Sequence, residues 1–310
     1  MHLKKKVLII GGTGFFGKSI VDFFLKKKLS NNIEIIVFSK KAKKFKFIKK
    51  INKNLFIKKI SGNILNTKNL PKADIIIYCA LLKNLDQDIK AVSNFISIAK
   101  KIYNDSKILY VSSGAVYGEL PNNVKNVKEN FSKIKDFKSD NYKKKYALAK
   151  IINEKQFKKL AKLGFKVSIA RCFSFVGEHL FGNSKYAIAD FIKNILSKKS
   201  IYIKSNYLVI RSYLHADDLS IFLLKIANKS NTNCPVYNCG SDDSVRLNRL
   251  SQLLSIKYDL KFICKKIKRS YLDQYVPNIN KFRKDFKFYK KLSSYNAVVK
   301  TINQLKNKQY

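Results

Sequence analysis

The chain has 310 residues, 46% of them hydrophobic, which is enough for a buried core. This composition excludes a disordered or fibrous protein. The formal net charge of +44 comes almost entirely from lysine, because only six of the 64 basic residues are arginine. The lysines occur in nearly every segment, so we interpret most of them as solvated surface. Binding of nucleic acid or of an acidic membrane is the alternative.

Five cysteines and three histidines are scattered through the chain without a Cys-x-x-Cys spacing. We therefore expect neither a disulfide framework nor a metal site, and a cytoplasmic location. The longest apolar run, within 73–82, is too short for a membrane span. The basic residues near the start precede only four apolar residues, so we interpret them as leading into a strand and not as a signal peptide.

The first predicted strand, Val7–Ile10, runs into a glycine-rich turn and then an amphipathic helix from Lys18 to about Lys28. This order is typical of a dinucleotide site, because glycines let the backbone approach a pyrophosphate and a helix N-terminus attracts negative charge. A tight turn that binds no ligand is the alternative. The cofactor-binding residues predicted here are Gly11, Thr13, Gly14, Phe15, Phe16 and Gly17.

The second predicted strand, Ile33–Phe38, ends at Ser39 and Lys40. An acidic residue at this point favours NAD, whereas a small residue followed by a base leaves room for the 2′-phosphate of NADP. Ser39 and Lys40 therefore favour NADP over NAD. A third strand, Leu55–Ile60, precedes a turn in which Asn63 and Ile64 are placed to contact an adenine ring.

A continuous apolar strand over Asp74–Ala80, a helix over Leu85–Lys101 and a strand over Lys107–Ser112 follow. Strands that alternate with helices of this length predict a Rossmann-type, doubly wound parallel sheet, an α/β fold. The carboxyl ends of parallel strands line the ligand site of such sheets. We therefore expect Cys79, Ala80 and Ser112 to contact the cofactor.

Tyr146 and Lys150 are spaced i and i+4 on a predicted helix, so they share one face. An ammonium group near a phenol, with a positively charged nicotinamide nearby, favours the phenolate and lowers the pKa of the tyrosine. Such a tyrosine could act as an acid/base near neutral pH. A solvent-facing pair is the alternative, but the pair follows the glycine turn and the hydroxyls of Ser112 and Ser113 in order.

Six segments in this order resemble the motifs of the extended short-chain dehydrogenase/reductase family, the NAD(P)-dependent epimerase/dehydratase group that modifies nucleotide sugars. The resemblance covers nearly the whole chain. The segments are G-G-T-G-F-F-G at 11–17, S-S-G-A-V-Y-G at 112–118, Y-A-L-A-K at 146–150, A-R-C-F-S-F-V-G at 170–177, R-S-Y-L-H-A-D-D-L at 211–219 and V-Y-N-C-G-S at 236–241.

The resemblance implies a role for each matching residue. Tyr146 would be the catalytic acid/base, Lys150 would hold the ribose and tune Tyr146, and Ser113 would bind the reacting oxygen of the sugar. Arg211 would bind the diphosphate of the substrate, and Ser174 stands where the family has a substrate-binding asparagine. The resemblance also implies a homodimer, a part in polysaccharide biosynthesis, and a substrate lobe of 174–211 and 241–310 beside a cofactor domain of 1–173 plus about 212–240.

The activity that the resemblance implies is hydride exchange at C4 of a nucleotide-diphosphate sugar, by a 4-keto reductase or a 4-epimerase. A dehydratase of the same family is an alternative, but Gly114 and Ala115 replace the Asp-Glu pair that 4,6-dehydratases carry after their serine or threonine. A non-catalytic, basic RNA-binding protein on the same scaffold is the alternative from another class. The retained Tyr146 and Lys150 favour the enzyme.

Overall fold

The computed structural model describes residues 5–26, 33–45, 55–121, 124–132, 142–180, 186–268 and 270–307. The chain divides into two compact units. Unit 1 comprises Met1–Gly118, Ser132–Cys172 and Ser220–Tyr237, and unit 2 comprises Glu119–Phe131, Phe173–Leu219 and Asn238–Tyr310. The domain limits expected from the sequence differ from this division by placing 119–131, 173, 212–219 and 238–240 in the cofactor domain, and they stay a prediction.

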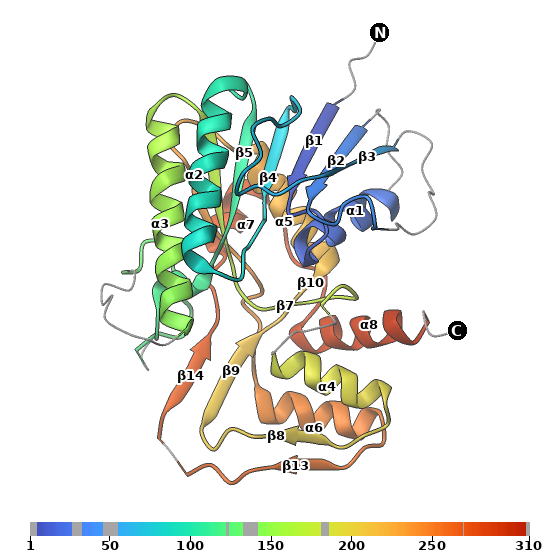
Figure 1. Ribbon diagram of the computed structural model, residues 1–310. Helices are drawn as coiled ribbons and strands as arrows, with labels where there is room; N and C mark the ends of the chain where they lie inside the picture. The colour runs from blue at the N-terminus through green and yellow to red at the C-terminus, as the bar shows by residue number, and fades with distance from the viewer. Residues whose placement is uncertain are drawn as a thin grey trace. The chain divides into compact units, whose positions relative to one another are not determined.

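Unit 1 is built on a seven-stranded sheet with the strand order β11-β6-β5-β4-β1-β2-β3 (Figure 1). The ladders that join β3 to β2, β1, β4, β5 and β6 are all parallel. The chain reverses its direction across the sheet at β1, which lies between β2 and β4, so this is the topological switch point. The predicted α/β fold class is confirmed. The strands are β1 (Lys5–Ile10), β2 (Ile33–Ser39), β3 (Leu55–Ser61), β4 (Ile75–Tyr78), β5 (Lys107–Ser113), β6 (Lys166–Cys172) and β11 (Val236–Cys239).

The helices of unit 1 follow the predicted order, with one shifted start. The first helix begins at Phe15 and not at Lys18, because the Lys18 N–H already donates to the Gly14 carbonyl at 3.0 Å. In α2 the Asn84 side chain caps the helix by accepting from the Gln87 N–H at 2.9 Å. The helical elements are α1 (Phe15–Lys26), α2 (Leu85–Ile102), the 3-10 turn η1 (Gly114–Tyr117), α3 (Tyr142–Lys162) and α5 (Ala216–Asn228).

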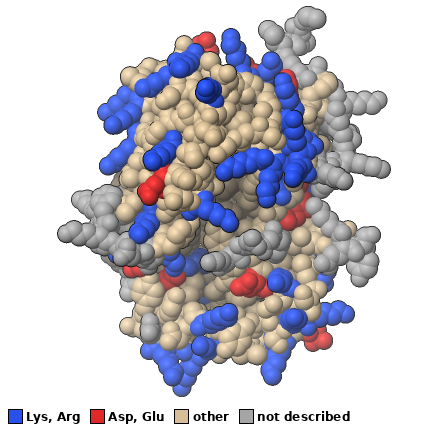
Figure 2. Space-filling model, in the orientation of Figure 1, with Lys and Arg blue, Asp and Glu red and all other residues tan. Residues whose placement is uncertain are grey.

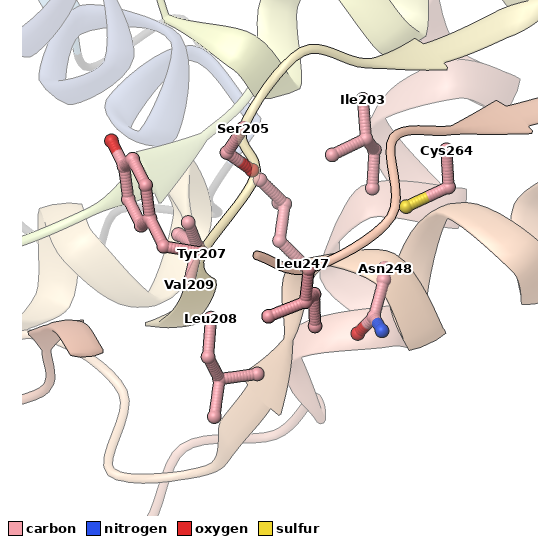
Figure 3. Close-up of a pocket in the computed structure, with 9 residues that line it drawn as sticks. Ile203, Ser205, Tyr207, Leu208, Val209, Leu247, Asn248 and Cys264 are labelled. Carbon is pink, nitrogen blue, oxygen red and sulfur yellow. The ribbon is translucent and has the colours of Figure 1, made fainter. Parts of the chain in front are cut away.

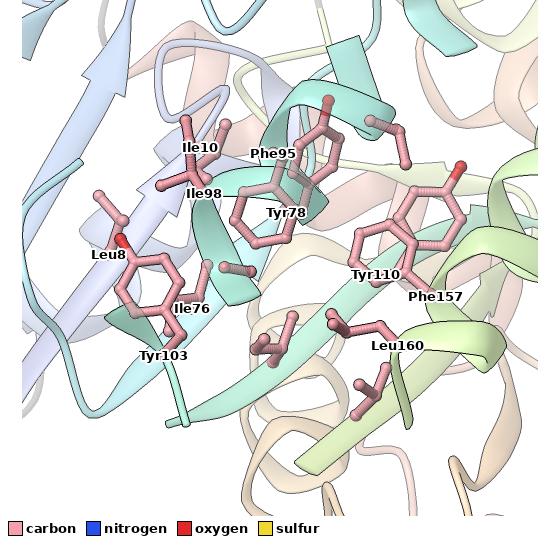
Figure 4. Packing of buried hydrophobic residues seen from close by; sticks show 14 of the residues in the cluster. Leu8, Ile10, Ile76, Tyr78, Phe95, Ile98, Tyr103, Tyr110, Phe157 and Leu160 are labelled. Atoms are coloured by element: carbon pink, nitrogen blue, oxygen red, sulfur yellow. The ribbon is translucent and has the colours of Figure 1, made fainter. Parts of the chain in front are cut away.

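The core of unit 1 lies between the sheet and the paired helices α2 and α3, which run side by side over one face (Figure 1). Rings from β4, β5, α2 and α3 fill its centre (Figure 4), and Tyr110 stacks on Phe157 with centroids 4.4 Å apart. Val7 and Ile9, which alternate with the core residues Leu8 and Ile10, are buried as well. Because successive strand residues point to opposite faces, the sheet is covered on both sides.

The described residues of unit 2 form three small sheets and four helices. The largest sheet has the order β12-β9-β14, with β12 antiparallel and β14 parallel to β9. The elements are β7 (Phe175–Val176), α4 (Ala187–Leu196), β8 (Ile201–Ile203), β9 (Leu208–Ser212), β10 (Leu214–His215), β12 (Ser244–Arg246), α6 (Leu247–Lys257), β13 (Phe262–Cys264), β14 (Leu272–Tyr275), α7 (Asn280–Phe286) and α8 (Ser294–Lys306).

A small cavity lies in unit 2 between the segments that carry β8, β9, β13 and the start of α6. Ile203, Leu208, Leu247 and Cys264 are among the side chains that line it (Figure 3). Its volume of about 10 Å³ holds roughly one water molecule, so it is too small for a sugar or a nucleotide. Across the described residues, no helix combines the length and the apolar composition needed to cross a membrane.

Candidate active site

The glycine turn between β1 and α1 is packed so closely that it leaves no room for a side chain at Gly11 or Gly17. Gly11 has a φ of 85°, which side-chain-bearing residues rarely adopt. A Cβ at Gly11 would lie 2.6 Å from the Cα of Ala80, and a Cβ at Gly17 would lie 2.3 Å from the Cα of Gly12. The first contact joins the turn to the end of β4, and the second lets α1 approach the turn backbone to backbone. This cradle at a helix N-terminus fits the pyrophosphate of a dinucleotide.

The end of β2 lies next to this turn. The hydroxyls of Thr13 and Ser39 are 2.9 Å apart and share a hydrogen bond. Lys40 and Lys41 follow and are exposed, so no acidic side chain stands directly after the strand. The predicted Thr13, Ser39 and Lys40 therefore belong to one local structure.

The predicted adenine-contacting residues Asn63 and Ile64 lie in the turn after β3. The Asn63 side chain accepts from the Leu65 N–H at 3.3 Å. Ile64 is buried in the core cluster, and its carbonyl accepts from the Asn94 side chain at 2.9 Å. The Ile64 side chain therefore packs in the core, and only the backbone of Ile64 is placed to contact a ligand.

Cys79 lies between the glycine turn and the lysine of the Tyr/Lys pair. Its thiol donates to the Ile10 carbonyl at 3.2 Å. Burial raises the pKa of Cys79 to about 12, while the charge of Lys150 and a backbone hydrogen bond from Gly17 oppose this rise. The thiol is therefore neutral at physiological pH, and it packs between two parts of the predicted site.

Ser113, Tyr146 and Lys150 come together at the carboxyl end of β5. Ser113 ends this strand and caps η1 by accepting from the Ala115 N–H at 3.2 Å. A hydrogen bond joins the side chains of Ser113 and Tyr146. Lys150 is only 3% exposed, and its Nζ lies 5.8 Å from the ring centroid of Tyr146 and 5.2 Å from that of Tyr110.

The chain's own groups do not lower the pKa of Tyr146. Burial raises this pKa to about 12, and the hydrogen bond with Ser113 opposes the rise only in part. The physical reason is that removing the phenol from water penalises its charged form. A lowered value for Tyr146 beside both Lys150 and a bound nicotinamide stays a prediction.

A buried ion pair that the sequence analysis did not identify lies beneath this site. The Arg171 guanidinium on β6 donates from its Nε and from one terminal nitrogen to the two carboxylate oxygens of Glu154, both at 2.9 Å. The same carboxylate accepts from Ser112 at 2.8 Å, and Arg171 also donates to the Tyr117 hydroxyl at 2.8 Å. The network ties α3 to β5, β6 and η1. In the sequence, the signal for Glu154 was its position four residues after Lys150, which places both residues on one face of the helix.

Ser174 and Arg211, the predicted substrate residues, both belong to unit 2. The Ser174 carbonyl accepts from the Leu214 N–H at 3.2 Å, and its side chain is partly exposed. Arg211 lies on β9 and forms an ion pair with Asp273 of β14 at 2.7 Å. It also donates to the Asp273 carbonyl at 2.8 Å, so its guanidinium is held in place while part of its surface stays accessible.

Basic side chains are spread over the visible face of the molecule and do not gather into one patch (Figure 2). The face carries lysines and arginines over many elements, with a few acidic groups among them. This distribution matches the interpretation of the charge as solvated surface.

The doubly wound sheet, the glycine turn at its switch point and the Ser113-Tyr146-Lys150 set define the class of dinucleotide-binding α/β proteins. Residues 7–240 match the NAD dependent epimerase/dehydratase family. The chain belongs to this family. The resemblance drawn from the six sequence segments is therefore confirmed, and the family binds NAD.

Three solved structures share the fold over nearly their whole length, and their sequence identities are too low to transfer an activity. No curated protein matches the chain in sequence. The first is dTDP-glucose 4,6-dehydratase from Bacillus anthracis in complex with NAD, with a TM-score of 0.77 and 18% identity over 98% of this chain and 97% of that chain. The second is UDP-N-acetylglucosamine 4-epimerase from Methanobrevibacter ruminantium in complex with UDP-N-acetylmuramic acid, with a TM-score of 0.76 and 22% identity over 99% of each chain. The third is the dTDP-glucose 4,6-dehydratase DesIV from Streptomyces venezuelae with NAD and TYD bound, with a TM-score of 0.73 and 15% identity over 98% of each chain.

Proposed function

We propose that the protein oxidises or reduces a nucleotide-diphosphate sugar at C4, as a 4-keto reductase or a 4-epimerase. The observation that carries the proposal is the set of Ser113, Tyr146 and Lys150 at one end of β5, with Ser113 and Tyr146 joined by a hydrogen bond. The glycine turn, at the carboxyl edge of the same sheet, supplies a pyrophosphate cradle. The UDP-sugar epimerase among the solved structures supports the substrate class by analogy of fold alone.

Each residue has a part in this reaction. The glycine turn and Lys150 would hold the dinucleotide, whose nicotinamide would supply the hydride donor or acceptor for C4 of the sugar. Tyr146 removes or returns the proton of the C4 hydroxyl, which is general acid/base catalysis. Ser113 holds the reacting oxygen, Lys150 holds the ribose of the dinucleotide and favours the phenolate of Tyr146 by its charge, and Arg211 binds the diphosphate of the substrate.

Dehydration is disfavoured by the residues that follow Ser113. Elimination of water needs a second acid/base group, and Gly114 and Ala115, which start η1, have no titratable side chain. Glu119, the next acidic residue along the chain, lies beyond the end of η1 at Tyr117 and does not stand directly after Ser113. A reductase or an epimerase needs only the tyrosine as its acid/base.

NADP is the dinucleotide that the end of β2 favours. Ser39 is small and is held by Thr13, and the exposed Lys40 follows it, so a 2′-phosphate would meet a hydroxyl and a positive charge instead of a carboxylate. Replacing Ser39 by aspartate should reverse the preference, because the carboxylate would bind the 2′-hydroxyl of NAD and repel the 2′-phosphate. Fluorescence titration with NADPH and NADH measures this directly.

The first test is to denature the purified protein, identify any nicotinamide released, and titrate the stripped protein with NADPH and NADH. A site that prefers NADPH and exchanges it indicates a 4-keto reductase, whereas tightly retained NAD indicates an epimerase that returns the same hydride. Retained NAD would also contradict the interpretation of Ser39 and Lys40. A protein that binds neither dinucleotide but binds RNA in a salt-sensitive way would refute the proposal.

A further inference from the structure

Asp88, in the first turn of α2, is a buried acid that the proposed mechanism does not use. Its side chain is 1% exposed. One carboxylate oxygen accepts from the Leu82 N–H at 2.8 Å, and the other accepts from the Asn153 side chain at 3.1 Å. Two oxygens that both accept hydrogen bonds are the pattern of an ionised carboxylate.

This carboxylate acts on the catalytic lysine. Asn153, its hydrogen-bond partner, follows Lys150 by three residues on α3, so the two side chains lie on neighbouring positions of one helix surface. Burial raises the pKa of Asp88, and the charge of Lys150 opposes that rise. Burial lowers the pKa of Lys150, while Tyr110 and Asp88 raise it, and the net change is upward. The two charges therefore stabilise each other.

The carboxylate of Glu154, four residues after Lys150 on α3, is already paired with Arg171 by two hydrogen bonds. The other described groups that act on Lys150 are tyrosines and cysteines. They are Tyr110 on β5, Tyr146 on α3, and the thiols of Cys79 and Cys172 at the ends of β4 and β6. Burial raises the pKa values of Tyr110, Tyr146 and Cys79, so these groups are neutral near pH 7. Tyr78 of β4, on the other side of Asp88, is also neutral, because burial raises its pKa.

A buried ammonium without a counter-charge would lose its proton, because desolvation disfavours the charged form. We propose that Asp88 is the positioning residue of the site: its carboxylate is the buried counter-charge that keeps Lys150 an ammonium group, and its hydrogen bond to Asn153 fixes the turn of α3 that presents Lys150. The consequence for turnover rests on the proposed function. The electrostatic interaction between Asp88 and Lys150 does not.

A double-mutant cycle tests the interaction between the Asp88 and Lys150 charges without any assay of activity. Urea unfolding is measured for the wild type, Asp88→Asn, Lys150→Met and the double variant. Asparagine keeps the shape and the acceptor for the Leu82 N–H but removes the charge. We expect Asp88→Asn to lower the urea midpoint in the wild-type background and to lower it by less than half as much in the K150M background.

Asp86→Asn is the matched control, because Asp86 is an exposed acid in the same first turn of α2. It removes the same charge from the same helix end, so it should change the midpoint equally in both backgrounds. Equal losses for Asp88→Asn in both backgrounds would overturn the proposal and leave Asp88 a structural residue. If Asp88→Asn does not fold, a folded double variant supports the proposal, and an unfolded double variant overturns it.

A second readout uses the binding of the dinucleotide as a function of pH. The folded pKa of Lys150 is raised, so its charge is lost only at alkaline pH, and Asp88→Asn should move that loss to lower pH. We expect the alkaline decline in NADPH or NADH affinity to begin at least one pH unit lower than in the wild type and the Asp86→Asn control. An unmoved decline would overturn the proposal. A protein that binds neither dinucleotide would refute the proposed function instead. The unfolding cycle would still show whether the Asp88 and Lys150 charges interact.

Discussion

Replacing Glu154 by glutamine removes the negative charge from the ion pair beneath the serines of β5. Glu154 and Arg171 are 0% and 2% exposed, and two hydrogen bonds of 2.9 Å join them. Glutamine keeps one acceptor but turns an amide NH₂ toward the guanidinium, so Arg171 stays buried without a counter-charge. Breaking a buried pair in this way costs about 3–5 kcal/mol. In a unit of this size, that loss lowers the melting temperature by roughly 10 °C.

The assay is thermal unfolding at pH 7, followed by circular dichroism. The control is the double variant Glu154→Leu with Arg171→Met, which removes both charges and fills the space with apolar atoms. It should recover most of the loss, since no charge remains buried, although Ser112 and Tyr117 each lose a partner worth about 1 kcal/mol. A loss below about 1 kcal/mol for Glu154→Gln would refute the reasoning, and so would a double variant as unstable as the single one.

Four further predictions concern the site. Tyr146→Phe should lower kcat by about 10²–10⁴-fold while dinucleotide affinity, measured by fluorescence titration, is retained; unchanged turnover would contradict the acid/base role. Burial raises the pKa of Tyr146 from 10.0 to about 12, so in the dinucleotide-free protein the tyrosinate absorbance that Tyr146→Phe removes should appear only as the pH approaches 12. The stability that Tyr146 contributes should be lost as the pH rises between these two values. A tyrosinate signal near neutral pH would show that burial does not raise this pKa. Gly17→Ala forces a Cβ to within 2.3 Å of the Gly12 backbone and should cost about 1–3 kcal/mol of unfolding free energy. Gly14→Ala, whose Cβ meets only the Gly11 carbonyl at 3.3 Å, should keep stability and lose dinucleotide affinity. Equal unfolding midpoints for the two variants would show that the close contact at Gly17 does not affect stability. Arg211→Met should raise KM for the nucleotide sugar by about 10-fold or more, since a charged hydrogen bond contributes about 1.5–3 kcal/mol. Dinucleotide affinity should be unchanged. A KM within twofold of the wild-type value would show that Arg211 does not bind the substrate.

The strands and helices of unit 1 could be predicted because their signals are local. Buried parallel strands give continuous apolar runs, as in 75–78 and 108–111, and the glycine turn gives a fixed spacing of small residues. The start of α1 was misplaced by three residues because Phe15 and Phe16 were assigned to the turn, whereas the backbone bond from Lys18 to Gly14 includes them in the first helical turn.

The partners of the charged side chains could not be predicted in the same way. In a chain with 64 basic residues, Lys150 and Arg171 look like any other solvated cation. The folded structure buries both, pairs Arg171 with Glu154 and brings Lys150 under the influence of the Asp88 charge. The pairing of β9 with β14, which holds Arg211 against Asp273, joins segments 62 residues apart. No local periodicity encodes such contacts, since they depend on the complete topology.

One face of α3 carries Tyr146, Lys150 and Glu154 at intervals of four residues, so their side chains form a single stripe along the helix. Glu154 fixes the middle of the helix to β5 and β6 through Ser112 and Arg171, and the Asn153 contact with Asp88 fixes it to α2. Tyr146 lies two turns nearer the N-terminus, and its hydrogen bond to Ser113 requires the helix to keep its register against β5. Loss of either buried anchor should therefore reduce kcat by more than the fraction of unfolded protein explains, because a small shift of α3 separates Tyr146 from Ser113 while the protein is still folded.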